Sequence, residues 1–414
     1  MHHISNRIAV LDGLRALAIL LVLLRHSIKP FWSDLSDPYI PLGPIDLGAI
    51  FINGWMGVDL FFVLSGFLIS SHLLQGLGKG RPLGPVLRSY IPRRFFRIAP
   101  VYYFVLALAV FGLFPFYPYP QSYENIVWRV LYHLIFMQDY WPSDIVVVFW
   151  SLAIEIKFYV LAPFLIYGLL KLKNIAAQAA LLVALVISQP LLRAGFAPDA
   201  QGFEAYFETV RTSFHFCLDG LLLGMLAALL WNHERLRAIL SRPVPASALF
   251  FGGALLVLGL AASGPLVDLE VSGFDKSWLV TVISCGFTAM LLGLLGGAFG
   301  HRLFCARGLT FIALISYSLY LVHLPLLYLA EIATRRFVDL DALSEGVAYV
   351  FYLPVFMALC VFVSTALYVF IEKPFINWSK KKFSPAPALK KEEGGKTEKG
   401  EKPDHIGHSG QKDG

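Results

Sequence analysis

Long apolar runs recur along most of this sequence, and they decide what the chain can fold into. A helix needs roughly 20 mostly apolar residues to cross a bilayer. About ten stretches meet that length, near residues 8–28, 50–72, 98–116, 145–170, 175–194, 210–231, 246–264, 278–299, 309–330 and 347–371. Backbone amides in hydrocarbon must be paired within their own element, and the runs lack the alternation of barrel strands. The sequence therefore predicts an all-α, polytopic membrane bundle of about ten helices.

Composition agrees with this class. Hydrophobic residues make up 57% of the 414 residues and charged residues only 15%, whereas soluble domains carry about 25% charged residues. The first run contains Asp12 and Arg15 and is followed by no cleavage site, so we expect it to anchor the chain. The four cysteines have no metal-ligand spacing, and we predict all four to be small buried side chains and no metal site.

Basic residues set the expected orientation. The segment between the second and third runs holds six of them and no acid: Lys79, Arg81, Arg88, Arg93, Arg94 and Arg97. The positive-inside rule makes this segment cytoplasmic, and counting outward predicts that both termini are cytoplasmic as well. The net charge of +6 follows from these inner segments and requires no nucleic-acid partner.

The end of the chain differs from the rest. We predict that residues 1–380 form one membrane domain. Residues 381–414 are rich in Lys, Glu, Gly and Pro and almost free of apolar residues, so they cannot bury enough surface to fold alone. They are predicted to be a disordered, charged cytoplasmic tail.

Ionisable residues inside the first run are candidate functional groups, because they are costly in a membrane. Arg15 and His26 are eleven residues apart, which returns to nearly the same helix face about 16 Å along the axis. Asp12 is one turn from Arg15, and we expect an ion pair between them. The simpler alternative for His26 is an interfacial position beside Arg25.

Two other runs place polar residues on one helix face. Ser151, Glu155 and Tyr159 share a face directly after Trp150, and Ser316, Tyr320 and His323 share another. Such groups form an active cavity or make structural hydrogen bonds between helices. A carboxylate at position 155 needs a cationic or hydroxyl partner.

The second and third runs carry a small-residue pair and an arginine pair. Ser65 and Gly66 interrupt an apolar stretch, which allows close helix approach or a cavity; Ser65 lacks the setting of a hydrolase nucleophile. Arg94 and Arg97 lie one turn apart near a helix start, where arginine favours phosphate. Ordinary positive-inside anchoring is the alternative for this pair.

Taken together, these segments resemble the acyltransferase 3 family of membrane O-acyltransferases, in the form without a C-terminal hydrolase-like domain. The matching stretches follow the family's order: LDGLRALAILLVLLRH, GVDLFFVLSGFLIS, RRFFRIAP, FWSLAIEIKFY, ISYSLYLVHLPL and IEKPF.

The resemblance implies transfer of an acyl group, usually acetyl, from cytosolic acyl-CoA to a hydroxyl of an extracytoplasmic or membrane-bound polysaccharide or glycolipid. No bound cofactor is expected; acetyl-CoA is a co-substrate. The implied site is, by role, His26, Arg15 and Glu155 for catalysis, Arg94, Arg97 and Ser65 for acyl-CoA, and Asp12, Trp150, Tyr320 and His323 around the acceptor or cavity.

The resulting hypothesis is a tunnel in which acyl-CoA enters from the cytoplasm and the acceptor from outside. His26 acts as base or carries the acyl group covalently, Glu155 orients His26 or holds the acceptor, and Arg15 polarises the thioester or anchors Asp12. We expect the protein to lie in a bacterial inner membrane, in contact with lipid, and it could form a homo-oligomer. The alternatives are another acyl group such as succinyl, a small-molecule acceptor, or a glycan or lipid transporter.

Overall fold

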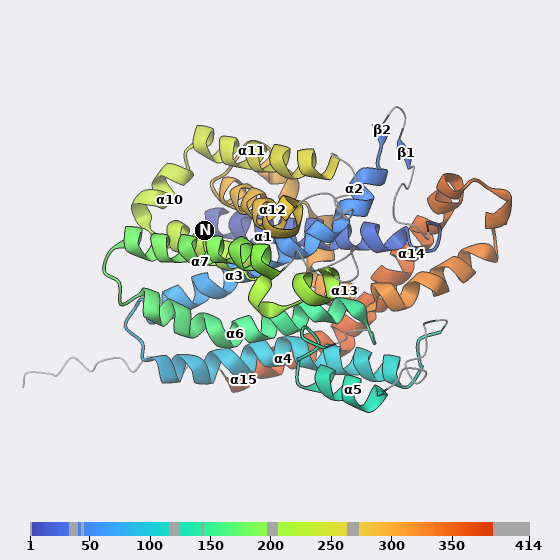
Figure 1. The fold of residues 1–414 in the computed structure, drawn as a ribbon, viewed down its shortest axis with the longest axis horizontal. Coiled ribbons are helices and arrows are strands. Elements are labelled where there is room, and N and C mark those ends of the chain that lie inside the picture. The colour runs from blue at the N-terminus through green and yellow to red at the C-terminus, as the bar shows by residue number, and fades with distance from the viewer. Residues whose placement is uncertain are drawn as a thin grey trace, which may run out of the picture. The chain divides into compact units, whose positions relative to one another are not determined.

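The computed structural model describes residues 2–32, 40–42, 45–115, 117, 125–141, 145–196, 206–262 and 273–383. Helices dominate (Figure 1). They are α1 His2–Ser27, α2 Gly48–Ile52, α3 Gly57–Leu77, α4 Leu83–Val110, α5 Ile126–Leu134, α6 Trp150–Leu169, α7 Ile175–Phe196, α9 Asp219–Asn232, α10 Glu234–Leu240, α11 Pro243–Ala262, α12 Gly273–Leu295, α13 Arg307–Arg335, α14 Glu345–Leu367 and α15 Lys373–Lys382. Two short strands, β1 Pro41–Leu42 and β2 Ile45–Asp46, pair antiparallel.

The chain is a multi-pass helical membrane protein, as predicted. Seven helical segments of the described chain are long and apolar enough to span: Gly48–Leu77, Val147–Leu169, Ile175–Phe196, Pro243–Ala262, Lys276–Leu295, Arg307–Arg335 and Glu345–Lys382. Each corresponds to a predicted run. The run near 8–28 falls almost entirely on α1, and the run near 98–116 overlaps α4 only as far as Val110; both helices fall outside this set. Cytoplasmic termini and the tail from residue 381 stay predictions; residues from 384 on lie outside the described residues.

The span predicted over 210–231 is wrong in its first half. The α-helix begins only at Asp219, and α9 has 14 residues, or about 21 Å of helix, which is short for a bilayer. A π-helical turn at Phe207–Arg211 and a 3₁₀ turn at Phe214–Phe216 precede it. Such irregular backbone is tolerated at membrane depth only where protein or water satisfies it.

Two buried ion pairs hold this irregular segment. Arg193 of α7 donates from Nη1 and Nη2 to the two carboxylate oxygens of Asp219, at 2.7 and 2.9 Å. Its remaining donors reach Thr281 Oγ1 and the carbonyl oxygens of Ser277 and Phe216. Arg211 donates from Nη2 to both oxygens of Asp59 on α3, at 2.9 and 3.0 Å. Charge and hydrogen bonds thus tie α3, α7, α9 and α12 to the segment before α9.

Glycines let α3 and α9 pack closely. A Cβ atom on Gly66 would lie 2.2 Å from the carbonyl oxygen of Leu221, and one on Gly224 would lie 2.2 Å from that of Val63. Of the alternatives for the Ser65–Gly66 pair, close helix approach therefore holds for Gly66, and no larger side chain fits there.

The cysteine prediction is half wrong. Cys217 and Cys360 are buried, as expected, but Cys285 is exposed and Cys305 partly exposed. Cys285 lies on the face of α12 that turns away from the bundle, since its neighbours Ser284 and Gly286 are buried.

Removal of one partner of the deepest ion pair should destabilise the fold. Arg193→Met leaves Asp219 as an uncompensated buried charge, which costs about 3–5 kcal/mol. Thermal unfolding of the purified protein in detergent measures this loss. The double variant Arg193→Met/Asp219→Leu removes both charges and should recover most of it. A double variant as unstable as the single one would contradict the assignment.

Candidate active site

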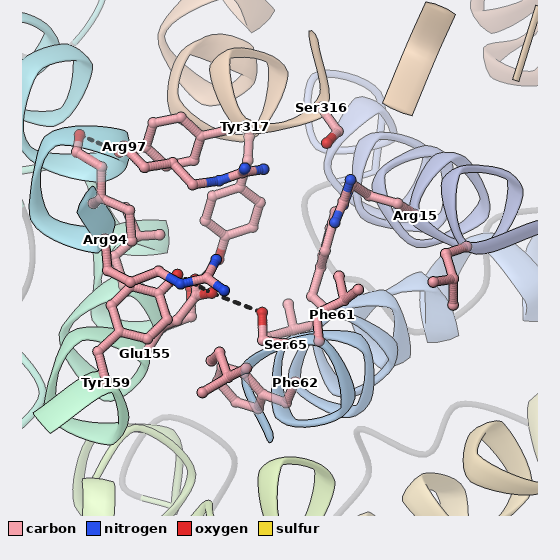
Figure 2. A pocket seen from close by; sticks show the side chains of 18 of the residues that line it. Arg15, Phe61, Phe62, Ser65, Arg94, Arg97, Glu155, Tyr159, Ser316 and Tyr317 are labelled. Atoms are coloured by element: carbon pink, nitrogen blue, oxygen red, sulfur yellow. Dashed lines mark hydrogen bonds between the residues drawn. The ribbon is translucent and has the colours of Figure 1, made fainter. Parts of the chain in front are cut away.

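A cavity of about 430 Å³ lies inside the bundle, between α1, α3, α4, α6 and α13. This volume is within the range of about 300–1,000 Å³ for small-molecule sites. Figure 2 shows that Arg15 enters it from one side, whereas Arg94 and Arg97 enter from the opposite side.

The cavity is elongated along the helices. On α3 its lining residues run from Val58 to His72, which corresponds to about 21 Å of helix axis. Near the His72 end, the rings of His72 and Tyr90 stack at 6.5 Å and the Arg94 guanidinium lies over the same Tyr90 ring. Near the Val58 end, the ring of Tyr320 lies 6.2 Å from that of Phe61, and its OH group lies 2.6 Å from Ser151 Oγ. One space therefore connects a cationic end with a hydroxyl-rich end over much of the thickness of a bilayer.

The arginines of the cavity are only partly neutralised. Arg15 Nη1 lies 3.4 Å from Asp12 Oδ1, which confirms the expected pair and makes it a long one. The Arg94 guanidinium lies over the rings of Tyr90 and Tyr159, 5.6 Å from each centroid. Neither Arg94 nor Arg97 forms an ion pair within the described part of the chain. This excess of positive charge favours an anionic ligand.

Glu155 has the hydroxyl partners that its position required. Its Oε1 atom accepts hydrogen bonds from Ser65 Oγ and from Tyr159 OH, both at 2.7 Å. Figure 2 shows the Ser65 contact as a dashed line. Oε2 has no donor among the residues that the structure describes and is free to accept from a ligand.

Ser151 and Tyr320 form the other end of the cavity. The two hydroxyl groups lie 2.6 Å apart, within hydrogen-bond distance, and both face the carbonyl oxygen of Val148, Tyr320 OH at 2.9 Å and Ser151 Oγ at 3.2 Å. The Tyr320 ring is in turn 5.8 Å from the ring of His323, one helical turn further on.

His26 and His323 form a pair just beyond Tyr320. The ring centroids are 4.9 Å apart, and His323 Nε2 lies 3.2 Å from His26 Nδ1. Both Nδ1 atoms also face carbonyl oxygens, that of Val22 for His26 and those of Leu319 and Tyr320 for His323. A carbonyl only accepts, so each Nδ1 carries the proton and His323 Nε2 accepts from His26. This tautomer leaves the Nε2 lone pair of His26 available as a base.

The structure brings most of the predicted site residues to one place. Seven of them line the cavity: Asp12, Arg15, Ser65, Arg94, Arg97, Glu155 and Tyr320. His26 and His323 lie next to it, behind Tyr320. Trp150 does not line the cavity; it packs against Phe62 and Phe207 and under the Arg211 guanidinium, 5.1 Å from its ring centroid. Trp150 thus links the segment before α9 to the cavity wall.

Sequence reasoning missed Glu372. This side chain is only 3% exposed and accepts a hydrogen bond from Ser318 Oγ at 2.9 Å. It ends a π-helical turn, Tyr368–Glu372, between α14 and α15. Single π turns inside helices are frequent at functional sites. The signal in the sequence is the acid of IEKPF at the end of an apolar run.

Water should reach the cavity at Ser65. Ser65 lines it, whereas Ser70, five residues along the same helix, is 0% exposed and does not. With Cys285 and Cys305 changed to Ser, we expect a small water-soluble thiol reagent to modify Ser65→Cys and to spare Ser70→Cys, as measured by mass spectrometry. Equal protection at both positions would mean that water does not enter.

These features define a multi-pass membrane protein with an arginine-lined cavity inside its helical bundle. The acyltransferase 3 family model, an acyltransferase domain, matches residues 8–369, and the chain belongs to this family.

Its relatives include two kinds of proteins. The peptidoglycan O-acetyltransferase OatA of Listeria monocytogenes is 26% identical over 339 residues, 77% of this chain and 49% of that protein. The putative peptidoglycan O-acetyltransferase YrhL of Bacillus subtilis is 29% identical over 57% of this chain and 35% of its own length. The putative membrane-bound transacylase BcsY of Komagataeibacter xylinus is 25% identical over 90% of this chain and 84% of its own length. The chain thus spans half or less of the first two relatives. No solved structure matches it.

Proposed function

We propose that the protein transfers an acyl group, acetyl in the simplest case, from cytosolic acyl-CoA to a hydroxyl of an extracytoplasmic or membrane-bound glycan at a bacterial inner membrane. The observation that carries this proposal is the elongated cavity, which is lined by arginines and also by Tyr320, whose ring packs beside the His323–His26 pair. Family membership and relatives described as peptidoglycan O-acetyltransferases support it.

The arginine end suits coenzyme A. Arg94 and Arg97 follow a segment rich in basic residues, which the positive-inside rule places in the cytoplasm. Their planar guanidinium groups match phosphate oxygens, and the partial exposure of both side chains leaves their donors available. Arg15 is about 16 Å of helix away from His26, so we assign it to the coenzyme arm. The free Glu155 Oε2 is placed to accept from an amide N–H of that arm.

The reaction takes place beyond the other end, near Tyr320 and His26. His26 Nε2 removes the proton of the acceptor hydroxyl while the hydroxyl oxygen attacks the carbonyl carbon of the thioester. The new C–O bond forms, the C–S bond breaks, and the proton passes from the imidazolium to the departing coenzyme A thiolate. His323 positions His26 through the contact to its Nδ1–H. In the covalent variant, His26 Nε2 first takes the acyl group itself.

Loss of His26 should abolish transfer without loss of coenzyme binding. A positioned base contributes about 10²–10⁴-fold, so we expect His26→Ala to lower kcat at least about 100-fold in detergent with labelled acetyl-CoA and glycan acceptors. His301→Ala, a histidine outside the site, serves as the control. Full activity of folded His26→Ala would remove the assignment. The same assay with succinyl-CoA in place of acetyl-CoA tests which acyl group is transferred. If the wild-type protein released no coenzyme A from any donor, the transporter alternative would be favoured.

Loss of Arg94 should weaken coenzyme A binding. A hydrogen bond to a charged group contributes about 1.5–3 kcal/mol, so Arg94→Gln should raise the Kd for coenzyme A roughly tenfold or more. Arg88→Gln lies on the same helix but is exposed and away from the cavity, and it should leave the Kd unchanged. Isothermal titration distinguishes the two. Equal losses in both variants would indicate a general charge effect.

A further inference from the structure

The end of α1 next to His26 carries a cation, Arg25, that has no counterion among the residues that the structure describes. Arg25 is only 5% exposed, and its Nη1 atom is buried without any hydrogen-bond partner. No ion pair within the described ranges includes Arg25. A buried charge without a partner costs several kcal/mol.

Two other buried guanidinium groups of this protein have carboxylate partners. Arg193, 1% exposed, is bound by the Asp219 carboxylate and by Thr281 and two carbonyl oxygens. Arg211, 6% exposed, is bound by both oxygens of Asp59. The chain itself neutralises these two arginines, which sets Arg25 apart from them within the described part of the chain.

A second cation lies beside Arg25. Lys29 follows Arg25 by four residues and lies in the turn after the end of α1 at Ser27, where its N–H donates to the carbonyl oxygen of His26 at 3.2 Å. Partial burial and the positive charge of Arg25 lower the pKa of Lys29, although the Lys29 side chain is exposed at its surface. The stem of Arg25 is fixed by the 3₁₀ turn Asn53–Met56, since a Cβ atom on Gly54 would lie 3.1 Å from Arg25 Cβ.

We propose that Arg25 and Lys29 bind an oxyanion, a phosphate or carboxylate, that the acceptor carries near the hydroxyl presented to His26. This inference rests on the proposed function for the identity of the acceptor, but the anion site itself does not. An arginine fork matches the paired oxygens of either group. The site thereby selects anionic glycans over neutral ones and places the acceptor beside the base.

An anionic lipid headgroup is the competing source of the same chemistry, because basic side chains near helix ends reach toward the membrane interface. The two sources differ in one respect that can be measured. A lipid site is filled by the bilayer itself, whereas an acceptor site stays open in any bilayer and binds a soluble anion.

The test is binding of inorganic pyrophosphate to the protein in phosphatidylcholine nanodiscs. The parent carries Arg94→Gln and Arg97→Gln, so that the coenzyme end does not bind the probe. We expect pyrophosphate to raise the Tm of this parent and of its Arg302→Gln control, in which an exposed arginine is lost. Arg25→Gln should lose the shift and, without pyrophosphate, melt no lower than the parent, because it removes an uncompensated charge. Lys29→Gln changes an exposed side chain and should raise the Kd for pyrophosphate several-fold. This variant keeps the test possible if Arg25→Gln does not fold.

An unchanged shift in Arg25→Gln, or in Lys29→Gln if Arg25→Gln is lost, would overturn the site. Displacement of pyrophosphate when phosphatidylglycerol replaces phosphatidylcholine would overturn the acceptor assignment in favour of a bound lipid. Both readouts are independent of acyl transfer. An inactive enzyme that still binds pyrophosphate through Arg25 would therefore count against the proposed function and leave the anion site standing.

Discussion

Neutralisation of charge inside a bundle that lies in hydrocarbon is the constraint on which the rest of this structure depends. The pairs Arg193–Asp219 and Arg211–Asp59 hold the irregular segment before α9 against α3 and α12. Arg211 also lies over Trp150, whose neighbour Ser151 closes one end of the cavity with Tyr320. The same ion pairs that permit a break in the helix thus support a wall of the candidate active site.

The cavity follows the opposite rule. Three arginines face it: Arg15, Arg94 and Arg97. Among the described residues, the single ion pair of this group is the long contact of Arg15 to Asp12. Glu155 is held by hydroxyl groups and keeps one oxygen free. The arginines that hold the segment before α9 are fully paired, whereas those that face the cavity are left open. Arg25 extends this contrast to the far end of α1.

Helical periodicity predicted which residues share a face but not what they meet. The shared face of Ser151, Glu155 and Tyr159 was readable from spacing, yet the partners Ser65 and Tyr320 come from 90 and 169 residues away along the chain. The break before α9 was hidden because residues 210–231 are apolar enough to continue a helix, and only tertiary ion pairs favour the irregular form. Cys285 and Glu372 show the same limit, since burial on one face of a helix depends on which neighbour covers it.

The central claim is that one cavity carries an acyl group from a donor on one side of the membrane to an acceptor on the other. A two-compartment assay tests it directly, with the protein reconstituted in sealed liposomes, its orientation determined by protease accessibility of the segment around Arg88, and labelled acetyl-CoA supplied on one side only. We expect label on glycan in the opposite compartment when acetyl-CoA is on the Arg88 side, and none when donor and acceptor are exchanged. Transfer only between a donor and an acceptor on the same side would contradict it.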